Sequence, residues 1–400
     1  MTTTTLRAPE RAHALRLWAT AITVVALASS LAMALDLLRP ALPAVVPGYA
    51  SWRLGYAHPA WYVYWILGDT TEATLAKSAL GGLLMIIGAA FAHAARRRGA
   101  RYQGFTQACG TGMWPWVAVS GGLGVVASNL LWGWTLSTPG GWQPTFAPFV
   151  SVPPAVVILY GEGWLVAVTG AALGATLVTP IAVLAVNEVC VPLGLSPVVG
   201  SVLAMSLGGL IACSICARLP WMPPLRASLA PAEPMPPAQV RHGPSWVPRR
   251  ILADLTEAHF YGNEWAGAGL LLGCVLHFLL NPAAPAYGSG LLPHLLAAQI
   301  LTAACGVMFW RGRHAAHGWY PTFVPVVSVA PATVLTFGGT LQAIIFGALL
   351  GAMIAPPLAA ALARRLPPHL PPMVAYTATM ALCTATIIPL LDLLPGFRHV

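Results

Sequence analysis

The sequence predicts an all-α polytopic membrane protein with about 11 transmembrane segments: two inverted five-span repeats plus an extra N-terminal span. Three observations predict this class. Only 8% of the residues are charged and 57% are hydrophobic, whereas soluble domains carry roughly 25% charged residues. One proline-rich stretch occurs twice. Apolar segments of membrane-spanning length surround both copies of that stretch.

The repeated stretch fixes how the chain is divided. Residues 141–155 read GWQPTFAPFVSVPPA, and residues 318–332 read GWYPTFVPVVSVAPA. Upstream, DTTEA at 69–73 matches DLTEA at 254–258, with a separation of 185 instead of 177 residues. This self-similarity indicates a fold made by duplication, in which one connecting loop differs in length between the copies.

The apolar segments follow this division in order. The first, at 15–38, is long enough to be a span rather than a signal peptide and has no counterpart in the second half. Residues 1–68 therefore form an N-terminal arm, this span and, at 39–68, an aromatic-rich interfacial loop. Repeat 1 (69–217) has apolar elements at 76–95, 113–136, 144–160, 163–187 and 196–217, and repeat 2 (251–400) has them at 263–281, 291–310, 321–337, 339–363 and 371–394. Residues 218–250 between them are predicted to be a proline-rich, basic cytoplasmic linker.

The net charge of +9 predicts a topology rather than a nucleic-acid partner. With a cytoplasmic N-terminus and eleven crossings, 16 of the 20 basic residues fall in cytoplasmic segments, as the positive-inside rule requires. The C-terminus is then outside, and the composition favours the plasma (inner) membrane of a bacterium. Because each copy has an odd number of spans, the two copies lie in opposite orientations, as in many transporters.

The repeated prolines predict where a solute path lies. Three prolines interrupt each copy, and each removes a backbone donor at membrane depth. Irregular backbone of this kind is tolerated where it is buried in protein or lines a wet cavity. Thr145, Ser151, Thr322 and Ser328 add hydroxyl groups to the same elements. We expect a broken helix that lines a path for a polar solute; the alternative is a helix that is merely kinked and packed.

Glu72 and Glu257 are the acidic residues with the sharpest functional prediction. They are equivalent in the two copies and precede the first span of each repeat, and carboxylates within membranes are functional candidates. The alternative is a carboxylate that stabilises a helix start, since Thr71 and Thr256 precede them. A salt bridge between Lys77 and Glu264 is a weaker hypothesis.

Catalysis and bound cofactors are not expected. The CxxC at Cys213 and Cys216 lies within an apolar segment without a second ligand pair, so no metal site is predicted. TEAT at 71–74 and GATL at 174–177 are similar to the sequence that accepts covalent flavin in some membrane redox subunits, but neither fits that sequence fully. No nucleophile triad or phosphate loop is present, and the chain is not predicted to be an enzyme.

The order of these segments resembles the urea transporter family. There, each repeat opens with a stretch like GQVxFxNNPxSGLLxxxG, to which TEAHFYGNEWAGAGLLLG at 256–273 is similar. Glu257 falls on the Gln, Phe260 on the Phe and Asn263 on the second Asn. TEATLAKSALGGLLMIIG at 71–88 is similar in the same way, with Glu72 on the Gln. The departures are an acid in place of the amide, proline-rich sequence in place of the NG pair, and a largely missing LPxxTxPF segment.

The resemblance implies a channel or facilitator for a small polar solute (urea, an amide or an amine), with its path between the repeats and no cofactor. It also implies a homotrimer in the lipid bilayer. Phe146 and Phe323 would form slots for a planar solute, and Asn263 would offer a hydrogen bond beside the four hydroxyl groups. Glu72 and Glu257 would guard the two mouths. The alternative function is a membrane subunit of a redox or biosynthetic complex, similar to the Rnf D subunit, without transport of its own.

Overall fold

The computed structural model describes residues 8–55, 58–137, 144–226 and 242–399, and within these residues it contains helices and no strands. The first half holds α1 (Ala8–Leu38), α2 (Tyr49–Leu54), α3 (Pro59–Asp69), α4 (Ala79–Arg97), α5 (Trp114–Trp132), α6 (Val152–Tyr160), α7 (Trp164–Leu173), α8 (Thr179–Leu184) and α9 (Pro197–Cys216). The second holds α10 (Trp246–Glu257), α11 (Glu264–Leu280), α12 (Leu292–Phe309), α13 (Arg311–His317), α14 (Val329–Phe337), α15 (Leu341–Ala363) and α16 (Met373–Asp392).

Eight helical segments in the described residues are long and apolar enough to cross a membrane: Glu10–Ala41, Ala79–Arg97, Trp114–Thr135, Trp164–Cys190, Pro197–Cys216, Leu292–Phe309, Leu341–Ala363 and Met373–Asp392. Three shorter apolar segments, at Ala147–Tyr160, Glu264–Leu280 and Pro325–Phe337, take the positions of the other predicted elements. The α-helical membrane class is therefore supported, whereas a count of eleven crossings stays a prediction.

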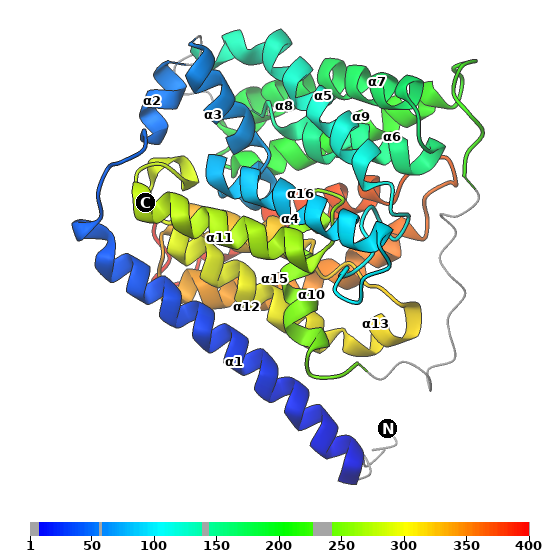
Figure 1. Cartoon of the computed structure of the whole chain (residues 1–400). Coiled ribbons are helices and arrows are strands. Elements are labelled where there is room, and N and C mark those ends of the chain that lie inside the picture. The colour runs from blue at the N-terminus through cyan, green and yellow to red at the C-terminus, as the bar shows by residue number, and fades with distance from the viewer. Residues whose placement is uncertain (1–7, 56–57, 138–143, 227–241, 400) are drawn as a thin grey trace.

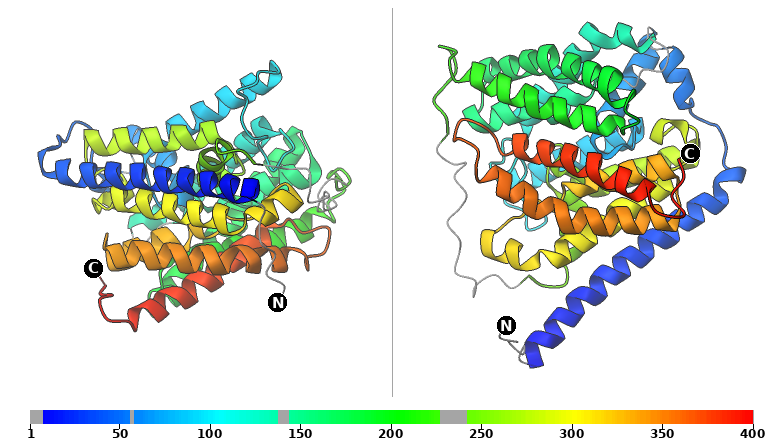
Figure 2. Two further views of the ribbon diagram at one scale, coloured as in Figure 1. Left: turned by 90° about the horizontal axis from the view of Figure 1, so that it is seen from below. Right: turned by 180° about the vertical axis from the view of Figure 1, so that it is seen from behind.

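The helices form two groups that meet along two helix pairs. In Figure 1, α5 to α9 occupy the upper part of the molecule and α10, α12, α13 and α15 the lower part. Contact between the groups runs mainly through α4 with α11 and through α9 with α16. Helix α1 lies at the periphery of the lower group and packs on α12. The views in Figure 2 also show this peripheral position.

Helices α4 and α11 are antiparallel and in close contact because glycines line their interface. A Cβ atom on Gly88 would collide with the backbone of Trp265, and one on Gly269 would collide with the backbone of Leu84. Small residues let two helices approach until their backbones touch, which is a common way of packing in membranes. The close packing of α4 and α11 consequently fixes the positions of the two turns that precede these helices, at residues 70–78 and 258–263.

The two proline-rich copies are broken at the same point, as expected. In the first, a short 3-10 turn at Ala147–Val150 ends at Ser151, which has φ −138° and ψ −108°, and α6 follows. In the second, a turn at Pro325–Val327 ends at Ser328, with φ −132° and ψ −86°, before α14. Each serine hydroxyl donates to the carbonyl oxygen four residues earlier, at 2.5 Å and 2.7 Å. The start of the first copy, 141–143, lies outside the described residues.

Two expected non-helical stretches are different in the structure. Residues 39–68, expected as an interfacial loop, contain α2 and α3, because Trp52 and Trp65 bury their rings in a small core of their own. Helix α10 begins at Trp246, within the expected linker, and it carries a buried Arg250. A basic residue assigned to a cytoplasmic loop is thus part of the protein interior.

Candidate functional site: a cavity lined by paired positions

A cavity of about 1660 Å³ lies between the two groups of helices. Its walls include residues that occupy matching positions of the two copies. From the turns before α4 and α11 and from the broken elements, the matching pairs are Glu72 and Glu257, Ala73 and Ala258, Leu75 and Phe260, Phe146 and Phe323, and Val150 and Val327.

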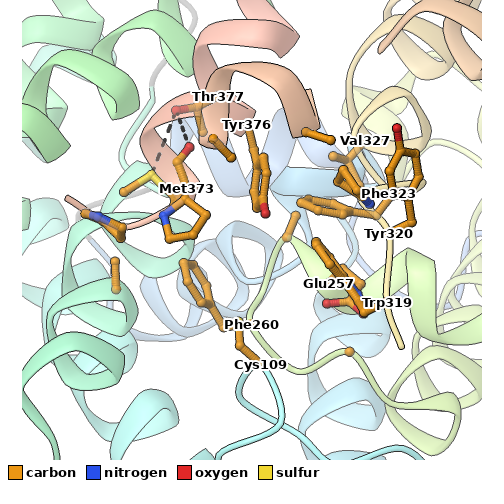
Figure 3. Close-up of a pocket in the computed structure, with 18 of the residues that line it drawn as sticks. Cys109, Glu257, Phe260, Trp319, Tyr320, Phe323, Val327, Met373, Tyr376 and Thr377 are labelled. Atoms are coloured by element: carbon orange, nitrogen blue, oxygen red, sulfur yellow. Dashed lines mark hydrogen bonds between the residues drawn. The ribbon is translucent and has the colours of Figure 1, made fainter. Parts of the chain in front are cut away.

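Helices α9 and α16 extend this pairing, at a constant separation of 175 residues. The pairs that line the cavity are Val198 and Met373, Ser201 and Tyr376, Val202 and Thr377, and Met205 and Met380. Chemistry differs within the pairs: α16 contributes a phenol where α9 contributes a small hydroxyl group. Figure 3 shows the Tyr376 side of the cavity, where the tyrosine ring points into the space beside Phe260 and Phe323.

The first copy places a buried charge cluster at the cavity. Lys77 forms ion pairs with Asp69 and, at 3.0 Å, with Glu72 Oε2. The second oxygen of Asp69 accepts hydrogen bonds from Thr145 Oγ1 and Asn129 Nδ2, both at 2.8 Å. All three charged side chains are at most 1% exposed. Two carboxylates thus share one ammonium group away from water.

The second copy builds a similar cluster with a different cation. Arg250 binds Asp254 Oδ1 through Nε at 2.8 Å, and its Nη2 donates to Glu257 Oε1. Asp254 Oδ2 accepts from Thr322 Oγ1 at 2.8 Å, which repeats the contact of Asp69 with Thr145. Here the cation precedes the carboxylates in α10, whereas Lys77 follows them in a turn. The arrangement of acids is thus shared, although the cations come from unrelated positions.

The turns that carry these clusters have the same unusual backbone. Leu75 has φ 56° and Phe260, at the matching position, has φ 61°. Two residues later Lys77 has φ 38°, and Gly262 has φ 51°. A positive φ is strained for residues other than glycine. Lys77 adopts it where the second copy has glycine, and its ammonium group is held by two carboxylates.

Burial and pairing act in opposite directions on these groups, which lie outside the spanning helices. Burial raises the pKa of Glu72 to about 7, although Lys77 acts to lower it. Burial likewise raises the pKa of Asp254 to about 6, against the effect of Arg250. Burial alone would lower the pKa of Lys77, but Asp69 and Glu72 raise it above its ordinary value. Pairing with the carboxylates thus keeps both cations charged, and burial raises the pKa of Glu72 and of Asp254 above their ordinary values.

Aromatic rings surround Glu257 at the cavity wall. Trp319 Nε1 donates to Glu257 Oε1 at 3.0 Å. The ring of Trp319 lies 5.9 Å from that of Tyr376 and 6.2 Å from that of Phe323, and Phe323 lies 5.7 Å from Tyr376. Figure 3 shows the carboxylate and these three rings facing a common space.

At Glu72 the cavity is closed by a tyrosine. Tyr287 donates its hydroxyl proton to Glu72 Oε1 at 2.9 Å. The other side of Tyr287 lines a second hollow of about 490 Å³, together with Tyr49 and Arg53. Tyr287 therefore links Glu72, which lines the large cavity, to a smaller hollow that does not include Glu72.

The structure separates the predicted site residues into two groups. Glu72, Phe146, Glu257 and Phe323 line the cavity. Thr145, Ser151, Asn263, Thr322 and Ser328 are buried behind its wall. The hydroxyl groups of the four Ser and Thr residues bind Asp69, Asp254 or nearby carbonyls. The Asn263 amide donates to the Phe105 carbonyl at 2.7 Å. These five residues support the wall and offer their polar groups to protein atoms rather than to a solute.

Several groups at the site were not singled out from the sequence. Trp319 and Tyr376 form the aromatic wall, Tyr287 closes the cavity, and Arg250 had been assigned to the linker. Lys77 and Glu264 do not pair as hypothesised, because Glu264 binds Arg249 at 2.7 Å. A usable signal existed for Lys77: it is the only lysine among 400 residues, and it lies beside two acids at the start of an apolar segment.

Thr74 and Thr176, in the two flavin-like sequences, do not line the cavity. Thr74 is buried and donates to the Thr71 carbonyl at 2.8 Å, and Thr176 is exposed on the outside of the helices and donates to Ala172. In the part of the chain that the structure describes, His, Cys, Asp and Glu residues form no group suited to a metal ion. The sequence matches no protein-family model, and comparison with curated proteins gives no relative.

Proposed function

We propose that this protein is a channel or facilitator that moves a small polar solute, such as urea, an amide or an amine, across a membrane. The observation that carries the proposal is the cavity whose walls come from matching positions of both copies. Membrane proteins built from inverted repeats bind their solutes where the repeats meet. The cavity has the size, the buried charges and the central position that such a path requires.

Inversion of the two copies is part of the proposal, and the antiparallel contact of α4 with α11 supports it. These helices follow matching turns, so two copies in the same orientation would make them parallel. Further local matches support the duplication: Ala108, Cys109, Gly110 and Gly112 have positive φ, and so have the four residues 178 positions later, at 286, 287, 288 and 290. The positive-inside rule then places the N-terminus and the Arg364 end of the cavity in the cytoplasm.

Stopped-flow light scattering on proteoliposomes tests this function. Vesicles that contain the purified full-length chain are challenged with urea, acetamide, methylammonium or guanidinium. We expect solute flux above that of empty vesicles for at least one of them. Absence of flux for all four solutes, with protein that unfolds cooperatively on heating, would contradict the proposed function.

A native thiol identifies the path in the same assay. Cys109 lines the cavity and is the exposed member of the seven cysteines. Modification by a methanethiosulfonate reagent should therefore reduce flux in the unchanged protein. The Cys109→Ser variant should transport normally and resist the reagent. A loss of flux that persists in Cys109→Ser would place the modified thiol elsewhere and the path outside this cavity.

A further inference from the structure

The charge balance at the Glu257 end of the cavity favours a positively charged ligand. Asp254 and Glu257 share the single guanidinium group of Arg250, so the ionised cluster carries one excess negative charge. Among the described residues, no hydrogen bond is donated to Glu257 Oε2, while Oε1 receives two. An ionised oxygen without a donor is costly away from bulk water. A cation whose N–H group donates a hydrogen bond to this oxygen would offset that cost.

The surrounding rings favour an organic cation over a metal ion. Trp319, Phe323 and Tyr376 stand within 6.2 Å of one another, centroid to centroid. Aromatic faces attract ammonium and guanidinium groups through their quadrupoles, whereas hard metal ions require several oxygen ligands. The Trp319 N–H is already used on Glu257, so the rings present mainly their faces to a ligand.

Other cations of the cavity leave this position available. Arg226, Arg313 and Arg364 also line the wall. In the described structure none of them donates a hydrogen bond to Glu257, and Arg226 Nη1 contacts the Met113 sulfur at 2.9 Å. Arg250 is committed to both acids of the cluster.

We propose that Glu257, with the rings of Trp319, Phe323 and Tyr376, forms a binding site for a small organic cation of the guanidinium or alkylammonium class. This inference rests on the proposed function, because it names the class of solute that enters the cavity. A planar guanidinium group would donate to Glu257 Oε2 while its face lies against a ring.

Equilibrium binding of radiolabelled guanidinium to the full-length protein in detergent tests the proposal. Urea is the matched competitor, because it has nearly the same planar shape without the charge. We expect methylammonium to displace guanidinium and urea to require an at least roughly tenfold higher concentration, since one ionic contact of about 1.4 kcal/mol corresponds to that factor. Displacement by urea at the same concentration would overturn the proposal.

Two pairs of variants assign the site. Glu257→Gln should weaken guanidinium binding by about tenfold, while Glu162→Gln, at an exposed loop position outside the cavity wall, should leave it unchanged. Phe323→Leu should weaken binding by about threefold through loss of a ring face, whereas Phe346→Leu, which is 44% exposed, should have no effect. Unchanged binding in Phe323→Leu and Glu257→Gln would overturn the proposal, and Phe323→Leu decides alone if Glu257→Gln fails to fold.

Flux and binding separate this inference from the proposed function. Urea flux without guanidinium binding would leave a facilitator and overturn the cation site. Guanidinium binding at Glu257 without flux of any solute would support the cation site and contradict transport.

Discussion

The two charge clusters of this protein have matching acids, but the residues next to those acids differ. Asp69 and Glu72 in one, and Asp254 and Glu257 in the other, each share a single cation. Tyr287 lies next to Glu72, and its hydroxyl group donates a hydrogen bond to the carboxylate. The matching position beside the second cluster, 178 residues earlier and with the same positive φ, is Cys109, which lines the open cavity.

This difference shows how one of two similar charge clusters can be covered by a single side chain. A tyrosine fills the space that a cysteine leaves free, and it also donates a hydrogen bond to the acid below it. Backbone geometry is retained, while Glu72 lines the large cavity and its partner Tyr287 lines the smaller hollow. Four experiments test how far the two copies are equivalent.

Removal of the buried cations should have the largest effect. Lys77→Met and Arg250→Met each leave two buried carboxylates without their ion pair. Loss of one partner of a buried pair costs roughly 3–5 kcal/mol. We expect both variants to unfold at much lower temperature in detergent, or to fail to accumulate, as measured by thermal unfolding monitored by circular dichroism.

Arg249→Met is the matched control, one residue before Arg250. Its side chain is 47% exposed and pairs with Glu264, so its loss should cost only about 0–1 kcal/mol. Equal destabilisation by Arg249→Met and Arg250→Met would contradict the assignment of the buried cluster as the stabilising one.

The clusters also show what could and could not be predicted from sequence. Apolar length located most of the long helices to within a few residues, because lipid exposure forces that pattern on a span, but it did not predict α2, α3, α10 or α13. Glu72 and Glu257 were found because they recur. Arg250 was assigned to a linker, because its cation has no counterpart in the first copy and one-dimensional charge counting favours loops. Tyr376 and Ser201 occupy matching positions, yet only the fold reveals that they face the same cavity as Glu257.

A cysteine at position 287 should be accessible from the membrane side opposite to that of Cys109. In a Cys109→Ser background, Tyr287→Cys removes the ring that separates Glu72 from the outer hollow. We expect the new thiol to react with a membrane-impermeant reagent applied to right-side-out vesicles. The thiol of Cys109 in the unchanged protein should react only in inverted vesicles. Reaction of both thiols from the same side would contradict the inverted arrangement of the copies.

The pH dependence of cation binding should follow the buried acids. Because burial raises the pKa of Asp254 to about 6 from 3.8, the cluster loses its excess negative charge as pH falls through about 6. Arg250 stays charged, and His314 stays neutral because its pKa lies well below the ordinary value. Guanidinium affinity should therefore be full near pH 8 and several-fold weaker near pH 5.

The same pKa shift has the opposite sign for stability. Folding raises the pKa of Asp254, so the folded state binds the proton more tightly and the free energy of unfolding decreases as pH rises from about 4 to about 6. Weaker guanidinium binding at pH 5 cannot then be attributed to unfolding through this group. Affinity that is constant between pH 5 and pH 8 would contradict the role of the cluster charge.

The smallest expected effect tests equivalence away from the site. Trp132 Nε1 donates to the Ala175 carbonyl at 2.8 Å, and Trp310 Nε1 donates to the Ala352 carbonyl at the same distance. Each bond ties the end of α5 or α12 to the helix that follows the broken element. Trp132→Phe and Trp310→Phe should each cost about 1 kcal/mol of unfolding free energy. Thermal unfolding should therefore show nearly equal losses of stability in the two variants. A large difference would mean that only one copy depends on this contact. The two copies would then match in geometry but not in the energy of this contact.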